Sequence, residues 1–264
     1  IAAAKGYKFR VYINDFVSIE RTQLIQAYGA EVVPFSTIEG FKEFYEASNG
    51  DFVAATKWLA EKVTAAEPQV HFLLQLDNPA NPAVHALTTG PEIWRDSGGK
   101  LDIFIAAVGT GGTLSGTGRY LKQQHPALQV IAVEPGVGSQ PSELRPEPLE
   151  ITGVHAFSNQ PPERIPANLD HRVYDEVIAV ETWQAYAAAR QLALHEGVLV
   201  GDSSGAVLWA ASQVAARPEN HGKRIVVLLA DGGSSYLSTQ LFAHQLPVES
   251  FKLANATQTS QKIA

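Results

Sequence analysis

A glycine-rich turn contains the residue types whose spacing points most directly to chemistry. It comprises, in order, Gly109, Thr110, Gly111, Gly112 and Thr113. Glycines let a backbone approach an anion closely, and a helix that follows such a turn directs unpaired N–H groups toward the same point. The two threonine hydroxyls are further donors. The pattern therefore predicts a phosphate-binding turn, and the alternative is a strand-to-helix turn that binds no ligand.

The turn departs from two common nucleotide-binding patterns. No Lys-Ser or Lys-Thr pair follows the glycines, so the turn is not the P-loop of nucleoside triphosphatases. The dinucleotide pattern G-x-G-x-x-G fails at its last position, where Leu114 stands. Glu134 follows Gly111 by 23 residues, and an acidic residue near that spacing binds the ribose in dinucleotide enzymes. A dinucleotide interpretation therefore stays open.

A second constellation lies at residues 201–205, where the sequence GDSSG matches the G-x-S-x-G nucleophile elbow of serine hydrolases. Asp231 and His244 follow in the chain order of such enzymes. No His-Gly-Gly oxyanion segment accompanies them. The more common outcome for such a pattern is a small-residue helix entry capped by Ser203 or Ser204. A serine hydrolase is therefore the less favoured alternative.

The composition excludes several other classes. The chain has no cysteine, which removes thiolate nucleophiles, disulfides and cysteine-based zinc sites. The net charge of −7 comes without a basic stripe, so no nucleic-acid partner is expected. No apolar run reaches the roughly 18 residues of a membrane span, and no signal peptide opens the chain, so we expect no membrane association and a cytoplasmic protein. The histidines lack metal-ligand spacing, so no metal site is predicted, and most are expected at the surface or in loops: His85, His125, His155, His195 and His221.

Short strand-like runs alternate with helical patterns along the chain. The predicted strands are residues 8–13, 31–35, 71–76, 101–108, 130–133, 177–180, 198–200 and 224–229. The predicted helices include residues 19–28, 52–65, 114–124 and 182–196. Ser18 and Thr182 are expected N-caps, and Gly29 and Gly197 are expected helix stops. This alternation predicts an α/β fold built around a parallel sheet.

Three glycine-bearing turns, at residues 109–113, 201–205 and 231–234, each follow a predicted strand. Ligands bind beyond the carboxyl ends of the strands in an open parallel sheet, so we expect the turns to face one site. Pro79 and Pro82 are expected to break regular structure and to mark a domain boundary. Residues 136–170 are expected to form an excursion or loop.

Seven sequence motifs, in one consistent order, resemble those of cysteine synthases. They are residues 75–82 (QLDNPANP), 88–94 (TTGPEIW), 108–116 (VGTGGTLSG), 133–135 (VEP), 165–170 (IPANLD), 201–205 (GDSSG) and 236–239 (YLST). The chain is thereby similar to the cysteine synthase (O-acetylserine sulfhydrylase) and cystathionine β-synthase family of fold type II pyridoxal-phosphate enzymes. The resemblance implies two three-layer αβα domains with twisted, mostly parallel sheets, like those of tryptophan synthase β. Residues 1–78 would be the remainder of the smaller N-terminal domain, and residues 79–264 the larger cofactor-binding domain and C-terminal tail.

The resemblance also assigns a cofactor and its contacts. It implies that the phosphate of pyridoxal 5'-phosphate lies at residues 109–113, that Ser203 hydrogen bonds to the pyridine nitrogen, and that Gln75 helps to hold the substrate carboxylate. The G-x-S-x-G match then becomes coincidental. The implied reaction is β-replacement through an aminoacrylate, which forms L-cysteine from an O-activated serine such as O-acetylserine and from sulfide or a thiol. A homodimer is the family expectation.

Several departures from the family pattern leave alternatives open. The family's Schiff-base lysine and substrate loop are expected upstream of the first residues of this sequence, so no lysine of the chain is nominated as catalytic. Leu76 stands where the family has phenylalanine, and residues 153–157 replace a Gly-Ile-Gly-Ala-Gly turn. Both changes lie near the expected substrate mouth. The alternatives are therefore condensation of serine with homocysteine, as in cystathionine β-synthase, or a non-catalytic relative, with a serine hydrolase third.

Overall fold

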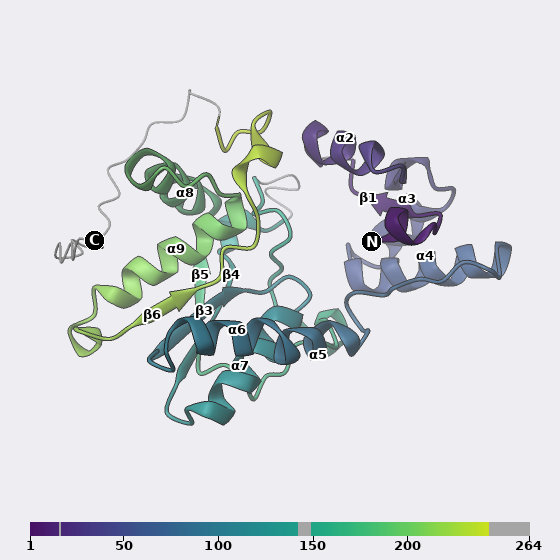
Figure 1. Ribbon diagram of the computed structural model, residues 1–264. Helices are drawn as coiled ribbons and strands as arrows, with labels where there is room; N and C mark the ends of the chain where they lie inside the picture. Colours follow the sequence, from purple (N-terminus) through teal and green to yellow (C-terminus); the bar gives the residue numbers. More distant parts are fainter. Residues whose placement is uncertain (16, 142–148, 243–264) are drawn as a thin grey trace.

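Two parallel sheets organise the chain (Figure 1). The computed structural model of the 264-residue protein describes residues 1–15, 17–141 and 149–242. One sheet has two strands, β1 (Arg10–Ile13) and β2 (Glu31–Pro34), and the other has four strands in the order β5-β4-β3-β6. Every described strand pair within these sheets is parallel. The α/β fold class that the sequence predicts is confirmed.

Helices α1 to α4 accompany the smaller sheet. Their bounds are α1 (Ala2–Lys5), α2 (Ile19–Ala27), α3 (Phe41–Ala47) and α4 (Phe52–Ala66), with a 3-10 turn η1 (Phe35–Thr37). Asp51 begins α4, because its side chain accepts a hydrogen bond from the N–H of Ala54 at 2.9 Å. Phe41, Ala55 and Leu59 form the small apolar core between α3 and α4.

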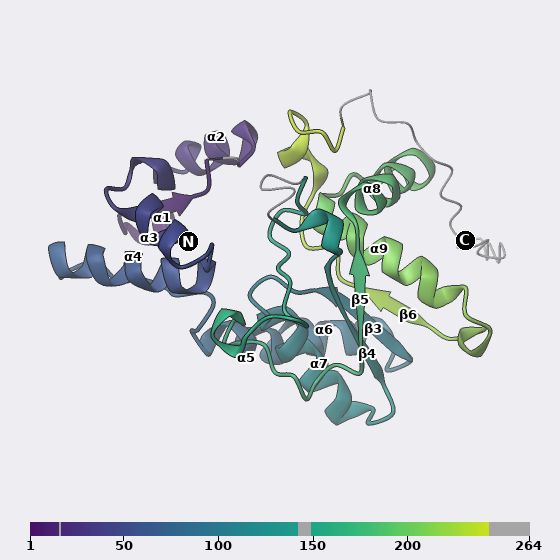
Figure 2. The same cartoon turned by 180° about the vertical axis from the view of Figure 1, so that it is seen from behind.

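The larger sheet is covered on both faces. Its strands are β3 (Ile103–Ala107), β4 (Gln129–Pro135), β5 (Glu176–Val180) and β6 (Ile225–Val227), and its helices are α5 (Ala80–Leu87), α6 (Thr89–Asp96), α7 (Gly112–Gln124), α8 (Thr182–Glu196) and α9 (Asp202–Ala215). The 3-10 turns are η2 (Val137–Ser139), η3 (Pro162–Arg164), η4 (Pro218–Asn220) and η5 (Gly233–Tyr236). Helices α8 and α9 lie over one face, and α6 and α7 over the other (Figures 1 and 2).

Strand β3 lies at the centre of the core, as its apolar sequence predicts. Phe104 and Ile105 are fully buried and point to opposite faces of the sheet. Phe104 packs in a cluster with Leu114 and Leu121 of α7, whereas Ile105 packs in a cluster with Val207 of α9. Burial on both faces explains why residues 101–108 form a nearly continuous apolar run.

Two predicted strands are wrong. Residues 71–74 have no regular structure and residues 75–77 form a turn, and Leu74 has a positive φ of 47°. Residues 198–200 contribute only an isolated antiparallel bridge between Val200 and Gly232. Both segments are rich in strand-forming residues, but no neighbouring strand among the described residues offers them a ladder of hydrogen bonds, and propensity alone does not make a strand.

Some helix starts also differ from the predictions. Glu181 and Gln184 form a capping box, so Thr182 is the first residue of α8 and not its cap. Ser18 lies at the N-cap position of α2, as predicted, but its side chain makes no capping hydrogen bond. Pro79 precedes α5, and Pro82 lies in its first turn, where a missing N–H costs nothing; the two prolines therefore begin a helix and do not interrupt regular structure.

The predicted loop at residues 136–170 is confirmed in the part that the structure describes. Residues 136–141 and 149–170 form loops with the short turns η2 and η3, as expected, and residues 142–148 lie outside the described part. None of the helices in the described ranges combines the length and the apolar character that a membrane crossing requires.

Candidate cofactor site

The glycine turn connects the carboxyl end of β3 to the first residue of α7, as its sequence predicts. Gly111 has a φ of 79°, a left-handed conformation that favours glycine. A Cβ built on Gly111 would lie 2.7 Å from the Cβ of Leu169, and one on Gly109 would lie 2.3 Å from the carbonyl oxygen of Gly153. These glycines are thus required by close packing within the protein. A larger residue at Gly111 would test that packing and not ligand binding.

The turn offers a set of unpaired donors. The first intrahelical hydrogen bond of α7 runs from the N–H of Ser115 to the carbonyl of Gly111. Within the described residues, no acceptor pairs with the backbone N–H groups of Gly111, Thr113 and Leu114. N–H groups at the start of a 13-residue helix attract an anion, both as donors and through the helix dipole. This donor set fits a phosphate group.

Asn81 connects the glycine turn to Gln75. Its side-chain Nδ2 donates to the hydroxyl of Thr110 at 2.9 Å and to the carbonyl oxygen of Gln75 at 2.8 Å. The same carbonyl oxygen accepts a second hydrogen bond from Nδ2 of Asn168, also at 2.8 Å. The Gln75 side chain is exposed. The structure therefore brings Gln75 beside the turn and leaves its amide available to a small molecule.

His85 contacts Thr113, the last residue of the glycine turn. Its Nε2 lies 3.2 Å from the hydroxyl of Thr113, and its Nδ1 lies 2.9 Å from the hydroxyl of Thr89. Burial lowers the pKa of His85, so the ring is neutral near pH 7 and one nitrogen accepts while the other donates. His85 lies partly buried in α5 and is the exception to the prediction that most of the histidines lie at the surface or in loops. The sequence around His85 does not predict its contact with Thr113, which lies 28 residues further along the chain.

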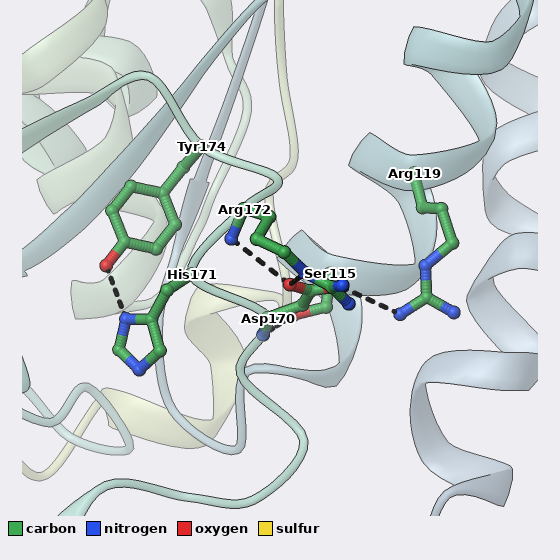
Figure 3. A network of polar contacts seen from close by, with 6 residues as sticks. All are labelled: Ser115, Arg119, Asp170, His171, Arg172 and Tyr174. Carbon is green, nitrogen blue, oxygen red and sulfur yellow. Dashed lines mark hydrogen bonds and ion pairs between the residues drawn. The ribbon is translucent and has the colours of Figure 1, made fainter. Parts of the chain in front are cut away.

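Residues 168–170 pack against the turn and are themselves anchored on α7 (Figure 3). The N–H of Asp170 donates to the hydroxyl of Ser115 at 2.8 Å. The Asp170 carboxylate accepts two hydrogen bonds from the Arg172 guanidinium, at 2.9 and 3.0 Å, one from the Arg172 N–H at 3.1 Å, and a longer one from Arg119 at 3.4 Å. The hydrogen bonds from Arg172 lower the pKa of Asp170 to about 2.

Ser203 lies in the first turn of α9 and is half-buried. Its N–H donates to Oδ1 of Asp202 at 2.8 Å. No partner of its hydroxyl is found among the described residues, so this group is free to meet a ligand. The prediction that Ser203 or Ser204 caps this helix is wrong, because Gly201 occupies the N-cap position.

Residues 151–155 lie between Ser203 and the glycine turn. The N–H of Thr152 donates to Oδ2 of Asp202 at 2.9 Å, and the N–H of His155 donates to the carbonyl of Val108 at 2.8 Å. The ring of His155 stacks on Phe52 of α4, with ring centroids 5.7 Å apart. Burial lowers the pKa of His155. Residues 151–155 thus contact both Asp202, which precedes Ser203, and Val108, which precedes the glycine turn.

The acidic residues of the two competing interpretations make other contacts. The buried Glu134 carboxylate accepts the N–H groups of Phe157 and Ser158 at 2.9 and 3.0 Å. Asp231 accepts hydrogen bonds from Arg21 and Tyr236. His244, the third member of a hydrolase triad, lies outside the described residues. Neither a ribose-binding Glu134 nor an Asp231-based triad is supported by these contacts.

Comparisons with known proteins identify related sequences. The family model of pyridoxal-phosphate dependent enzymes matches residues 1–231. Cysteine synthase A of Escherichia coli K12 is 39% identical over 252 residues, which cover 92% of this chain and 72% of that protein. Cysteine synthase 3 of Caenorhabditis elegans is 37% identical, with 93% of this chain and 68% of the relative covered.

Solved structures give the same result. The cysteine synthase of Entamoeba histolytica is similar with a TM-score of 0.75 and 32% identity, covering 96% of this chain and 69% of that one. An O-ureido-L-serine synthase is similar with a TM-score of 0.72 and 34% identity, covering 91% and 70%. The resemblance to cysteine synthases of fold type II is confirmed, and the chain belongs to the family of pyridoxal-phosphate dependent enzymes.

Proposed function

We propose that the protein forms L-cysteine from O-acetylserine and sulfide with pyridoxal phosphate as cofactor. The observation that carries this proposal is the side chain of Asn81, which hydrogen bonds both to Thr110 in the phosphate-binding turn and to the backbone of Gln75. A donor set for a phosphate and a donor for a substrate carboxylate are thereby held side by side. The similarity to cysteine synthases gives this arrangement its substrate class.

The residues present fit the cofactor. The unpaired N–H groups of Gly111, Thr113 and Leu114 would hold its phosphate, together with the hydroxyl of Thr113. The Ser203 hydroxyl would hydrogen bond to the pyridine nitrogen. A neutral serine does not hold that nitrogen protonated as a carboxylate would. When bound, pyridoxal phosphate supplies an electron sink that favours loss of the β-substituent of the amino acid.

The protein supplies orientation to this chemistry. The amide of Gln75 would donate to the substrate carboxylate and so fix the position of the amino acid beside the turn. Neutral His85, with its lowered pKa, holds the Thr113 hydroxyl without adding a charge beside the phosphate. We nominate no lysine of this chain for the covalent attachment of the cofactor.

The proposal also includes the domain division, the oligomeric state and the cellular location. A division into residues 1–78 and 79–264 is supported by the separate grouping of β1–α4 and of the elements from α5 onward in Figure 1. A homodimer and a cytoplasmic location are supported only by the resemblance to cysteine synthases.

The test is product formation by the purified full-length protein loaded with pyridoxal phosphate. Supplied with O-acetylserine and sulfide, it is expected to release cysteine and acetate. In a parallel reaction, serine and homocysteine are expected to give no cystathionine. Cystathionine as the main product would replace the proposal by a cystathionine β-synthase activity, and cofactor binding without either product would indicate a non-catalytic relative.

A further inference from the structure

Asp202 is a buried carboxylate at the edge of the proposed cofactor site. It is the first residue of α9 and only 1% exposed. Each of its two carboxylate oxygens accepts a backbone N–H, Oδ1 from Ser203 at 2.8 Å and Oδ2 from Thr152 at 2.9 Å. The two donors are 51 residues apart in the sequence and belong to different segments.

Both segments border the site. Thr152 precedes Gly153, whose carbonyl oxygen lies 2.3 Å from the Cβ position of Gly109 and so packs directly behind the phosphate-binding turn. The N–H of His155 extends this contact to the carbonyl of Val108, at 2.8 Å. Ser203 lies on the other side, where the proposed contact to the pyridine nitrogen is made. One carboxylate therefore connects the phosphate side of the site with its ring side.

A carboxylate is a costly choice for this place. Burial raises the pKa of Asp202, and the negative charge of Asp231 acts in the same direction. A serine would accept the N–H of Ser203 without a buried charge, but its single hydroxyl could not accept both N–H groups in the two directions that Asp202 serves. Only a carboxylate of this length supplies two acceptors in these two directions, and it thereby connects the two segments.

We propose that Asp202 is a positioning residue that fixes Ser203, at the start of α9, relative to residues 151–155 and thereby to the phosphate-binding turn. The inference rests on the proposed cofactor site, because it assigns a purpose to the fixed separation of its two ends. Asp202 touches neither substrate nor the reacting atoms. It acts through the backbone of the residues that do.

The test substitutes Asp202→Asn and measures two quantities. An amide keeps the size of the side chain but turns one acceptor into an N–H donor that faces a backbone N–H, so one of the two connections is lost. Hydrogen exchange of the amide that loses its acceptor, that of Thr152 or of Ser203, is expected to become about tenfold faster in the protein without cofactor. The dissociation constant of pyridoxal phosphate is expected to rise about tenfold, and the absorption band of the bound cofactor is expected to shift.

Asp175→Asn is the control, at an exposed carboxylate that also pairs with Lys122. The Asp175 carboxylate also accepts a backbone N–H from another segment, that of Val130 at 2.7 Å, but at the opposite, amino end of the larger sheet. This variant is expected to speed exchange at Val130 and to leave the cofactor affinity and its absorption band unchanged. If Asp202→Asn does not fold, Asp202→Ser provides the comparison, because its hydroxyl can accept from the helix but not reach Thr152.

The outcomes separate the inference from the proposed function. A wild-type protein that binds no pyridoxal phosphate would overturn the proposed function, and the inference with it. A wild-type protein that binds the cofactor, with variants at Asp202 that bind it equally well, would overturn the inference alone. Faster exchange at Thr152 or Ser203 with unchanged affinity would also overturn it, because Asp202 would then stabilise the fold locally without influence on the site.

Discussion

At the scale of the residue, two threonines of α7 show how the environment decides what a hydroxyl contributes. Thr113 lies at the start of the helix, bonded to His85 at 3.2 Å, with unpaired backbone N–H groups beside it. Thr117 lies one turn later and is fully buried, and its Oγ1 has no hydrogen-bond partner in the part of the chain that the structure describes. The first hydroxyl lies in the proposed phosphate-binding turn, and the second is an uncompensated polar atom.

The variants Thr113→Val and Thr117→Val are expected to affect different properties: the first weakens cofactor binding, and the second stabilises the fold. Thr113→Val removes a donor from the phosphate-binding turn and is expected to weaken pyridoxal-phosphate binding about five- to tenfold, measured by equilibrium titration. Thr117→Val replaces an unpaired hydroxyl by a methyl group of the same shape, so it is expected to raise the free energy of unfolding by about 1 kcal/mol and leave cofactor affinity unchanged. Equal affinities of the two variants would contradict the phosphate-binding role of Thr113.

At the scale of the element, the sequence predicts segments that bury a regular apolar pattern. Strand β3 is predicted well because helices on both faces of the sheet demand an unbroken apolar run, and α7 because its apolar residues recur at helical spacing. The glycine turn is predictable because it lies between these two well-predicted elements. Residues 198–200 have a similar local composition, but they are not a strand, because strand formation depends on a neighbour that local sequence does not encode.

The contacts that hold the site together are less predictable. Asn81 is identified only as part of a motif, and nothing local indicates that its amide joins Thr110 to Gln75. Asp202 reads from sequence as the variable position of a G-x-S-x-G pattern, although its carboxylate is buried and connects two segments. Such long-range side-chain contacts follow from how the elements pack, and a single sequence carries no periodic signal for them.

The anchoring of residues 168–170 on α7 predicts a pH dependence of stability. Hydrogen bonds from Arg172 lower the pKa of Asp170 from 3.8 to about 2, so the folded protein binds this proton less tightly than the unfolded chain does. The ionised Asp170 therefore stabilises the fold fully above about pH 4, and this contribution disappears as the pH falls toward 2. Arg172 is 89% exposed, which screens the interaction and limits the contribution to about 1 kcal/mol.

Asp170→Asn should be less stable than the wild type by about 1 kcal/mol at pH 7, and the difference should narrow between pH 4 and pH 2. Urea unfolding at a series of pH values measures both effects. Asp96→Asn is the control, because the Arg95–Asp96 pair is exposed by 72% and 67% and is expected to contribute little at any pH. A difference for Asp170→Asn that stays constant over this pH range would contradict the role of its charge.

At the scale of the whole molecule, α2 contacts residues 231–238, which follow β6 (Figure 2). Arg21 donates to Asp231 at 2.9 Å and to the hydroxyl of Tyr236, and its guanidinium lies 4.7 Å from the centre of the Tyr236 ring. Glu20 accepts the N–H and hydroxyl of Ser238 at 2.8 and 2.7 Å. These contacts join the part of the chain that contains the smaller sheet to the part that contains the larger one, close to Gly201, where the N–H bonds to the carbonyl of Asp231.

The Arg21–Asp231 pair should therefore stabilise the arrangement of the two parts by more than an ordinary surface pair does. Its side chains are 30% and 29% exposed, whereas those of the Lys42–Glu46 pair on α3 are 79% and 65% exposed. Lower exposure reduces the screening of the interaction by solvent.

A double-mutant cycle with Arg21→Ala and Asp231→Asn is expected to give a coupling energy of about 1 kcal/mol in urea unfolding, against roughly 0.3 to 0.5 kcal/mol for Lys42→Ala and Glu46→Gln. The single variant Arg21→Ala should also speed amide exchange at Ser238 and leave exchange in β3 unchanged, because the larger sheet has its own core. A coupling for the Arg21 pair no larger than that of the Lys42 pair would mean that packing, and not this ion pair, holds α2 against residues 231–238.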